Sequence, residues 1–266
     1  MKMGFLYRQL LPDIFQITDA LGVSMTLLVG ENKALLADTG YGLEDVGAFV
    51  RQLTQKSVTV LLTHGHHDHA LGMRWFNEVE IFPEDFEVLK TYTGEKYRRK
   101  VLESAKAAGI EVEQESYLTA PIPAVQPLHA GTMDLGGLSC QAILCPGHTP
   151  GSAVIYVPER KLLLTGDNWN PCTWLFFPEA LPVKEYLSNM KKLLEIPFEN
   201  VICSHRGSLY HREDLEAFLY GLTDEALKNA RETDTGAAYH VITKEAAPCP
   251  EQVLVFDSRK SELIFC

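Results

Sequence analysis

The stretch Thr63-His64-Gly65-His66-His67-Asp68-His69-Ala70 is the most informative part of this chain. It follows an apolar run, Val58-Thr59-Val60-Leu61-Leu62, whose composition is typical of a buried strand. Imidazole and carboxylate groups together suit borderline divalent metals such as zinc. So many of these groups at the end of one strand make little sense as part of a hydrophobic core. The stretch therefore predicts the floor of a metal site.

A histidine-rich turn can also be a solvated loop, and three further segments argue against that alternative. His148 lies in the segment Cys145-Pro146-Gly147-His148-Thr149-Pro150-Gly151-Ser152. Asp167 closes the apolar run 161–167, and His205 ends the run that begins at Asn200. Each of these polar groups is expected at a strand-to-loop junction, which is where α/β proteins build their sites.

Together with Leu35-Leu36-Ala37-Asp38-Thr39-Gly40, these segments resemble in their order the motifs of the metallo-β-lactamase superfamily. The closest resemblance is to its dinuclear hydrolase branch, which includes glyoxalase II. It extends from about Ile14 to about Gly207. The resemblance implies an α/β fold of the four-layer αββα sandwich type, in which two sheets pack face to face with helices outside.

The resemblance also implies a role for each matched residue. One metal ion would be bound by His64, His66 and His148, the second by Asp68, His69 and His205, and Asp167 would bridge both. A water held between two metals loses its proton near neutral pH and becomes the nucleophile. Asp68 would also be catalytic, because the motif places it where it can take or relay a proton. We expect two divalent ions, most simply zinc, although the same ligands accept iron and manganese.

Other polar residues near the motifs have less specific interpretations. His67 fills the variable position of its motif, and we expect its side chain to point away from the metals. Asp38 either orients the metal-binding loop through hydrogen bonds or is a plain turn residue before Thr39-Gly40. The histidines that match no motif are expected to be structural or exposed, with His211 near enough in sequence to line the pocket: His129, His211 and His240.

Composition limits the possible partners and the compartment. The chain has 266 residues and a formal net charge of −11, which argues against nucleic acid as a partner. No apolar run is long enough to span a membrane, and the first residues lack the pattern of a signal peptide. Six scattered cysteines without a C-x-x-C pair are typical of a reduced, cytoplasmic protein.

The apolar pattern indicates one large domain. We expect residues 1–235 to form the metallo-β-lactamase-like domain and residues 236–266 to add a strand-rich extension of the same domain. Segment 33–40 echoes segment 161–167, and each is followed by a predicted helix and strand, which suggests two similar β-α-β halves. The predicted helices cover 43–55, 95–108, 183–196 and 212–231. Strands over 239–243, 252–256 and 262–265 would form a hairpin on the sandwich or a homodimer contact.

The expected reaction is metal-dependent hydrolysis of an ester or thioester type bond in a small molecule by a metal-bridging hydroxide. Three alternatives stay open: a mononuclear iron sulfur dioxygenase, a phosphodiesterase of the ribonuclease Z type, and a binding protein with a degenerate site. An aromatic stretch after Asp167 would form an apolar wall of the site or pack into the core: Trp169, Trp174, Phe176 and Phe177.

Overall fold

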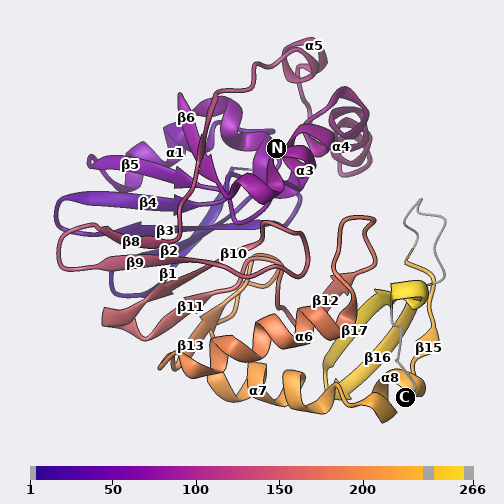
Figure 1. The fold of residues 1–266 in the computed structure, drawn as a ribbon. Coiled ribbons are helices and arrows are strands. Elements are labelled where there is room, and N and C mark those ends of the chain that lie inside the picture. Colours follow the sequence, from indigo (N-terminus) through magenta and orange to yellow (C-terminus); the bar gives the residue numbers. More distant parts are fainter. Residues whose placement is uncertain (1–3, 236–242, 261–266) are drawn as a thin grey trace.

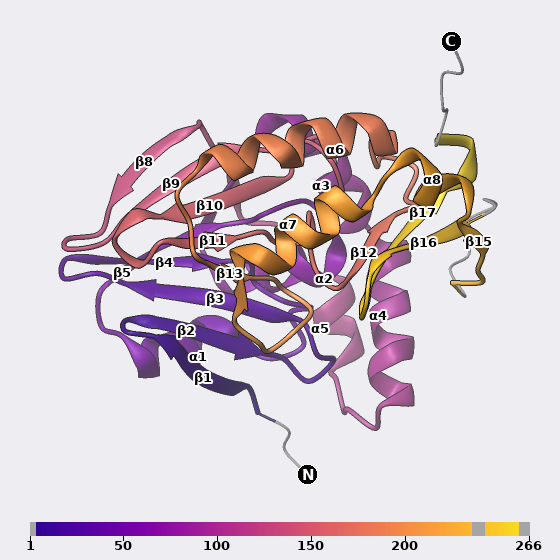
Figure 2. The same cartoon turned by 90° about the horizontal axis from the view of Figure 1, so that it is seen from below.

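The computed structural model of the protein describes residues 4–235 and 243–260. In this part of the chain two large sheets pack face to face, and helices cover their outer faces (Figures 1 and 2). The predicted four-layer αββα sandwich is therefore confirmed. No helix in the described ranges is long and apolar enough to cross a membrane.

The first sheet has seven strands in sequence order, β1 to β7. Their bounds are β1 Leu6–Leu11, β2 Ile14–Thr18, β3 Ser24–Val29, β4 Lys33–Ala37, β5 Ser57–Leu61, β6 Glu78–Ile81 and β7 Ala124–Pro127. The second sheet has the order β14-β13-β11-β10-β9-β8. Its strands are β8 Gly131–Asp134, β9 Ser139–Leu144, β10 Ala153–Val157, β11 Leu162–Leu164, β13 Asn200–Ile202 and β14 Tyr210–His211.

The helices lie mostly between or after these strands. They are α1 Val46–Leu53, α2 His67–Ala70, α3 Phe86–Tyr92, α4 Glu95–Ala107, α5 Gln114–Leu118, α6 Val183–Lys192, α7 Arg212–Gly221 and α8 Asp224–Lys228, with 3-10 turns η1 Leu71–Trp75, η2 Pro83–Asp85, η3 Pro158–Arg160, η4 Leu193–Glu195 and η5 Ser258–Lys260. The helices predicted over 43–55, 95–108 and 183–196 thus correspond to α1, α4, and α6 with η4.

The alternation of side chains along each strand explains which residues pack in each layer of the sandwich. In β4, Leu35 packs in the cluster between the two sheets, whereas Ala34 and Leu36 pack in the outer cluster with Val50 of α1. Successive side chains of a strand point to opposite faces, so β4 is buried on both. That is why it reads as an unbroken apolar run. Helices α6 and α7 cover the outer face of the second sheet in the same way.

The two predicted β-α-β halves are present. Strand β4 lies parallel to β5, with Leu35 opposite Thr59, and α1 connects them. Strand β11 lies parallel to β13, with Leu163 opposite Val201, and α6 lies in the connection. Parallel neighbours end at the same edge of a sheet, so each half delivers two strand ends together.

A third, smaller sheet was not predicted as such. It has the order β12-β17-β16-β15, with β12 Cys172–Leu175, β15 Arg231–Glu232, β16 Thr243–Cys249 and β17 Gln252–Asp257. The predicted strand over 252–256 is confirmed by β17, which pairs in parallel with β12 (Figure 1). The strand expected over 239–243 lies almost wholly, and the one over 262–265 entirely, outside the described residues, as does His240.

The single long helix expected over 212–231 is wrong, because α7 and α8 are separate. Gly221 ends α7 where its Cα faces the Pro248 carbonyl; a Cβ there would lie 2.2 Å from that oxygen. Thr223 then caps α8 by accepting a hydrogen bond from the Ala226 backbone N–H. The sequence signal was present, since threonine followed by acidic residues is typical of a helix start.

Asp85 joins two loops that come from different sheets. Its carboxylate is fully buried and accepts hydrogen bonds from the backbone N–H of Gly65 at 2.7 Å and of Gly151 at 2.6 Å. The Thr149 hydroxyl donates a third at 2.9 Å. In the structure Asp85 holds the loop after β5 against the loop between β9 and β10.

Replacing Asp85 should therefore destabilise the sandwich strongly. Asp85→Ala leaves the buried N–H groups of Gly65 and Gly151 without a partner, while the Thr149 hydroxyl keeps Ser152, and we expect the free energy of unfolding to fall by about 3–5 kcal/mol. The matched control is Asp45→Ala, which removes the N-cap contact with the Ala48 N–H and an exposed ion pair with Arg51 at 3.9 Å, and should cost about 1 kcal/mol. Urea unfolding followed by circular dichroism measures both. Equal losses would contradict the joining role of Asp85.

Candidate metal centre

The predicted metal ligands all lie where strands end, at one edge of the sandwich. The histidine-rich stretch follows β5 and leads into α2, Asp167 follows β11, and His205 follows β13. His148 lies in the connection between β9 and β10. Direct backbone hydrogen bonds join the two sheets at this edge, from Ala153 N–H to the Thr63 carbonyl at 2.7 Å and from Ser24 N–H to the Ser204 carbonyl at 2.7 Å.

Two glycines allow these loops to approach closely. A Cβ on Gly65 would lie 2.4 Å from the Leu89 backbone nitrogen, so no side chain fits between the metal-binding loop and α3. Gly166 has a φ of +54° and lies against Thr63, where a Cβ would be 2.8 Å from the hydroxyl oxygen. A positive φ is unfavourable for most residues with a Cβ. Both glycines are therefore needed to bring the strand ends together.

The structure brings the seven predicted ligands into two groups. The three-histidine group is His64, His66 and His148, and the aspartate–histidine group is Asp68, His69, Asp167 and His205. Within each group the possible ligand atoms all lie within 4.8 Å of one another. In the first, His148 Nε2 is 2.9 Å from His66 Nδ1. The side chains of four ligands are almost completely buried: His64, His66, His69 and His148. The other three, Asp68, Asp167 and His205, are partly exposed.

Asp167 lies between the two groups. Its Oδ2 atom is 3.0 Å from His205 Nε2 and 3.4 Å from His69 Nε2. The same oxygen is 3.7 Å from His148 Nε2, which belongs to the three-histidine group. Asp68 is more one-sided: its Oδ2 is 3.4 Å from His69 Nε2 and 3.5 Å from His205 Nε2. Of the two carboxylates, Asp167 is thus the one within reach of both groups.

Asp38 forms hydrogen bonds with two residues of the metal-binding segment, Thr63 and His69. It is buried, has a positive φ of 66°, and accepts hydrogen bonds from the Thr63 backbone N–H at 2.7 Å and the Thr63 hydroxyl at 2.9 Å. Its Oδ2 also lies 2.9 Å from His69 Nδ1. The hydrogen-bonding interpretation of Asp38 is therefore the one that the structure favours, since this residue, directly after β4, orients Thr63 and His69 and is not a plain turn residue. With Nδ1 donating to Asp38, the Nε2 atom of His69 is left as the lone-pair donor.

The polar atoms left without hydrogen bonds fit a pair of cations. Among the described residues, the buried side-chain atoms that lack a hydrogen-bond partner include His64 Nε2, His69 Nε2 and Asp167 Oδ1. Buried polar atoms are seldom left unpaired, and each such case calls for an explanation. Imidazole nitrogens and carboxylate oxygens are ligands for borderline divalent metals. The donor set and the orphaned atoms thus both fit metal binding.

The electrostatics of the two groups differ. Burial, together with the neighbouring histidines, holds the pKa of His64 well below its usual value and lowers the pKa of His148 to about 4. Burial would raise the pKa of Asp167, but His205 and His69 hold it well below the usual range. His64 and His148 are therefore neutral at pH 7, as metal ligation requires, while the carboxylate of Asp167 stays ionised.

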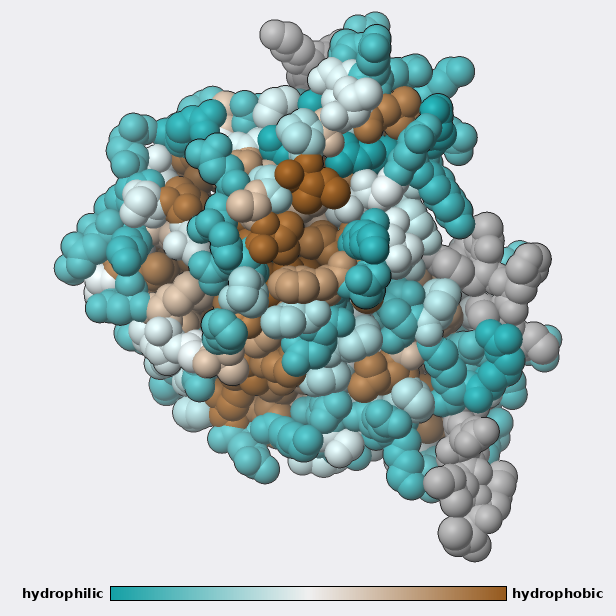
Figure 3. Space-filling model, turned by 45° about the horizontal axis from the view of Figure 1, so that its top comes forward, coloured by the Kyte–Doolittle hydropathy of each residue, from teal (hydrophilic) through white to brown (hydrophobic). Residues whose placement is uncertain are grey.

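A pocket of about 490 Å³ opens beside both groups. Ligands from each group line it, together with Tyr41, Asn170, Cys172, Trp174, Phe177 and Arg206. Its size is in the range that holds a small-molecule ligand. The face of the molecule that Figure 3 shows is largely hydrophilic, and hydrophobic residues form smaller patches on it. Arg206 is the one cationic side chain among the residues that line this pocket.

The aromatic stretch after Asp167 divides between the pocket and the core. Trp174 and Phe177 line the pocket, and Trp174 is 42% exposed. The wall role expected for Trp169 is wrong: this residue is fully buried, packs against Tyr210 and Phe218, and its indole N–H donates to Gln252. Phe176 is buried as well. Of these four residues only Trp174 lies in β12 (Cys172–Leu175), where it is exposed while its neighbours Thr173 and Leu175 are buried.

The remaining histidines lie outside both groups. His67 is in α2, where its ring packs against those of Tyr41, Tyr92 and Tyr97. His211 does not line the pocket; it caps α7. One polar neighbour of the ligands was missed by sequence reasoning, namely Glu179, whose Oε1 is 2.5 Å from His66 Nε2. It belongs to no motif, and its sequence distance from His66 gives no signal.

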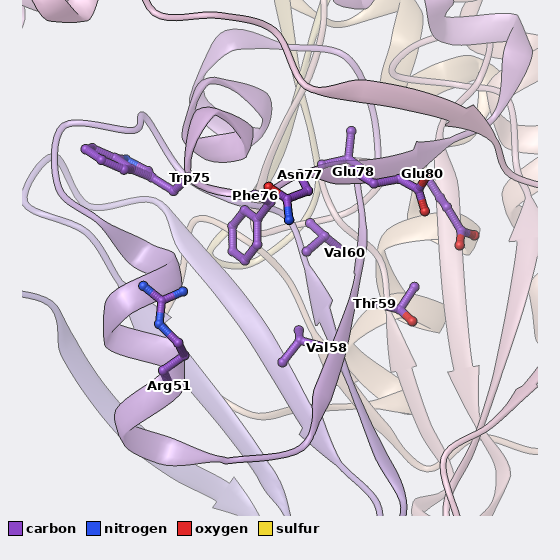
Figure 4. Close-up of a pocket in the computed structure, with 10 residues that line it drawn as sticks. Arg51, Val58, Thr59, Val60, Trp75, Phe76, Asn77, Glu78 and Glu80 are labelled. Atoms are coloured by element: carbon purple, nitrogen blue, oxygen red, sulfur yellow. The ribbon is translucent and has the colours of Figure 1, made fainter.

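A second cavity, of about 380 Å³, lies away from the metal groups (Figure 4). Its walls come from α1, β5 and the segment leading into β6, with Arg51, Trp75 and Glu78 among the residues shown. No histidine or cysteine lines it. It therefore offers carboxylates, from Glu78 and Glu80, but none of the imidazole donors of the strand-end site.

Two relatives illustrate what the chain is similar to. It is 31% identical over 152 residues to a hydroxyacylglutathione hydrolase of Bartonella quintana (strain Toulouse), which is 55% of this chain and 48% of that protein. It is 23% identical over 190 residues to the acyl-coenzyme A thioesterase MBLAC2 of Gallus gallus, which is 64% of this chain and 66% of that protein. The chain thus matches about half to two thirds of the length of these relatives.

A solved structure and a family model cover more of the chain. The crystal structure of TTHA1623 in a di-iron-bound form superposes with a TM-score of 0.55 at 26% identity, covering 75% of this chain and 94% of that one. The family model of the metallo-β-lactamase superfamily matches residues 18–205, the range that contains every predicted ligand. By this match and by its fold, the chain belongs to the metallo-β-lactamase superfamily.

Proposed function

We propose that the protein is a metal-dependent hydrolase that cleaves an ester or thioester bond in a small molecule. The observation that carries the proposal is the meeting of a three-histidine group and an aspartate–histidine group beside one pocket, with Asp167 within reach of both. Relatives that hydrolyse thioesters, a hydroxyacylglutathione hydrolase and an acyl-coenzyme A thioesterase, support the substrate class.

The seven side chains would hold two divalent cations, with Asp167 bridging. When bound, the cations would supply a deprotonated water near neutral pH and an electrophile for the substrate carbonyl. Burial opposes ionisation of Asp68, but His69 and His205 hold its pKa well below the usual range, so it can accept or align a proton. Burial, aided by Asp68, raises the pKa of Tyr41, whose hydroxyl stays protonated and can donate to a substrate oxygen.

Two ions fit the residues better than one. A mononuclear iron dioxygenase needs a single set of ligands, whereas here the second group offers four further donors in one place. The di-iron-bound form of TTHA1623 supports a site for two metal ions. Zinc is our expectation for the metal, and iron and manganese suit the same donors. A phosphodiesterase acting on RNA would need a basic surface, which a chain of net charge −11 does not offer.

The pocket favours an apolar group next to the bond that is cleaved. Trp174 and Phe177 form its aromatic wall, and the Phe177 ring centroid lies 4.6 Å from that of His66 and 5.2 Å from that of His148. An acyl group seated on these rings would lie beside the three-histidine group. Burial of apolar surface there would contribute to binding without any change at the metal ligands.

Removing the bridge should uncouple the two ions. Asp167→Ala deletes the carboxylate shared by both groups, so we expect loss of at least one ion per chain and a fall in hydrolysis of at least about 100-fold. The measurement is metal content by plasma mass spectrometry after purification without chelators, with activity on the same sample. His67→Ala is the matched control and should keep both ions, with activity within about tenfold. Two retained ions in Asp167→Ala would show that the bridge lies elsewhere.

The aromatic wall should distinguish substrates by size. We expect small carboxyl esters or thioesters to be cleaved faster than any phosphodiester on the same metal-replete sample. Trp174→Ala should lower kcat/KM for bulky apolar acyl groups by about tenfold or more, and change that for an acetyl ester little, since truncating a buried aromatic contact costs roughly 1–3 kcal/mol. Tyr220→Ala, which alters an exposed aromatic on α7, is the control. Faster turnover of bis-aryl phosphodiesters than of matched carboxyl esters would overturn the assignment.

A further inference from the structure

His66 is the one ligand in the three-histidine group whose outer nitrogen faces a carboxylate. Its Nε2 lies 2.5 Å from Glu179 Oε1, and the two side chains are only 3% and 15% exposed. By contrast, His148 Nδ1 donates to the backbone carbonyl of Trp174, at 2.7 Å, and His64 Nδ1 lies 3.1 Å from the Thr63 hydroxyl. Among the described residues, Glu179 is therefore the carboxylate that contacts an outer nitrogen of this group, on the side of the ring away from the other two histidines.

The contact fixes which nitrogen of His66 carries a proton. A carboxylate accepts hydrogen bonds, so Nε2 must donate to Glu179, and in a neutral imidazole this leaves the lone pair on Nδ1. Nδ1 is the atom that lies 2.9 Å from His148 Nε2, on the metal side of the ring. The partner of one ring nitrogen thus sets the ring orientation and the basicity of the other.

Glu179 itself is held in place by its surroundings. Besides its contact with His66, the carboxyl group of Glu179 accepts a hydrogen bond from the Tyr92 side chain. The loop that carries it, residues 176–181, is fixed from the other side by Lys260 of η5. The Lys260 ammonium donates to the carbonyls of Phe177 at 3.0 Å, Pro178 at 2.6 Å and Ala180 at 2.6 Å.

We propose that Glu179 is a positioning residue for His66, through which the aromatic wall of the pocket is coupled to cation binding by the three-histidine group. The loop that places Phe177 against the rings of His66 and His148 is the same loop that places the Glu179 carboxylate. Any change that moves this wall therefore changes the support of a metal ligand. The inference depends on one part of the proposed function, namely that the three-histidine group binds a divalent cation.

The test is a zinc titration of the full chain, against a competing chromophoric chelator, for the parent and two variants. Glu179→Ala removes the acceptor, and we expect one of the two zinc affinities to fall by about 10–100-fold while the other changes little. Glu179→Gln keeps an acceptor of the same size without the charge, so its loss should be smaller. Glu185→Gln, at an exposed position of α6 in the same part of the chain, is the control and should titrate like the parent.

Each outcome of the titration is decisive. The proposal is overturned if Glu179→Ala, with the parent's circular dichroism spectrum, binds both ions within twofold of the parent. If that variant does not fold, a parent-like titration of Glu179→Gln overturns it instead. A parent that binds zinc but cleaves no ester or thioester ends the proposed function and leaves this inference standing. A parent that binds no zinc ends both.

Discussion

Asp167 keeps one carboxylate oxygen between 3.0 and 3.7 Å from imidazole nitrogens that belong to three different segments of the chain. An isolated carboxylate is costly to bury, by several kcal/mol even after the protein relaxes. Here the cost is offset by histidines, because the carboxylates of Asp167 and Asp68 raise the pKa of His69 and of His205 against the effect of burial. Bound cations would take over that compensation and displace the protons.

This electrostatic constraint explains the architecture around it. The imidazoles can surround Asp167 only if strand ends from both sheets meet, which the face-to-face packing of the sandwich achieves. Asp85 and Asp38 then hold the loops in place, because their carboxylates accept hydrogen bonds from backbone N–H groups and from hydroxyl groups. In His64, His66, His69 and His148 one ring nitrogen thus faces the cluster and the other has a polar partner.

Patterns within short stretches of sequence predicted the features that depend on residues close together in the chain. The motifs around His64 to His69 carried the resemblance to the metallo-β-lactamase superfamily, and that resemblance implied the sandwich. The echo between 33–40 and 161–167 predicted the two β-α-β halves with their parallel pairs. The order of the motifs along the chain indicated that the seven side chains would converge, and the structure brings them together.

Contacts between distant segments could not be predicted in this way. Asp85 and Glu179 act on loops that lie 20 or more residues away, and nothing in their own neighbourhood marks them. Trp169 and Trp174 belong to one aromatic stretch, yet they face opposite sides. Trp169 is buried against Tyr210 and Phe218, whereas Trp174 lies in β12, which pairs with β17 about eighty residues later; no period within the stretch reveals these distant contacts.

The parallel pairing of β12 with β17 has a consequence for how the protein is made. Every member of the two metal-binding groups is synthesised by residue 205, whereas the strand and the lysine that hold the aromatic wall come at residues 252–260. The loop that carries Phe177 also carries Glu179, whose carboxylate contacts His66. The pocket wall and the support of one metal ligand are therefore complete only once the last described strand of the chain has been synthesised.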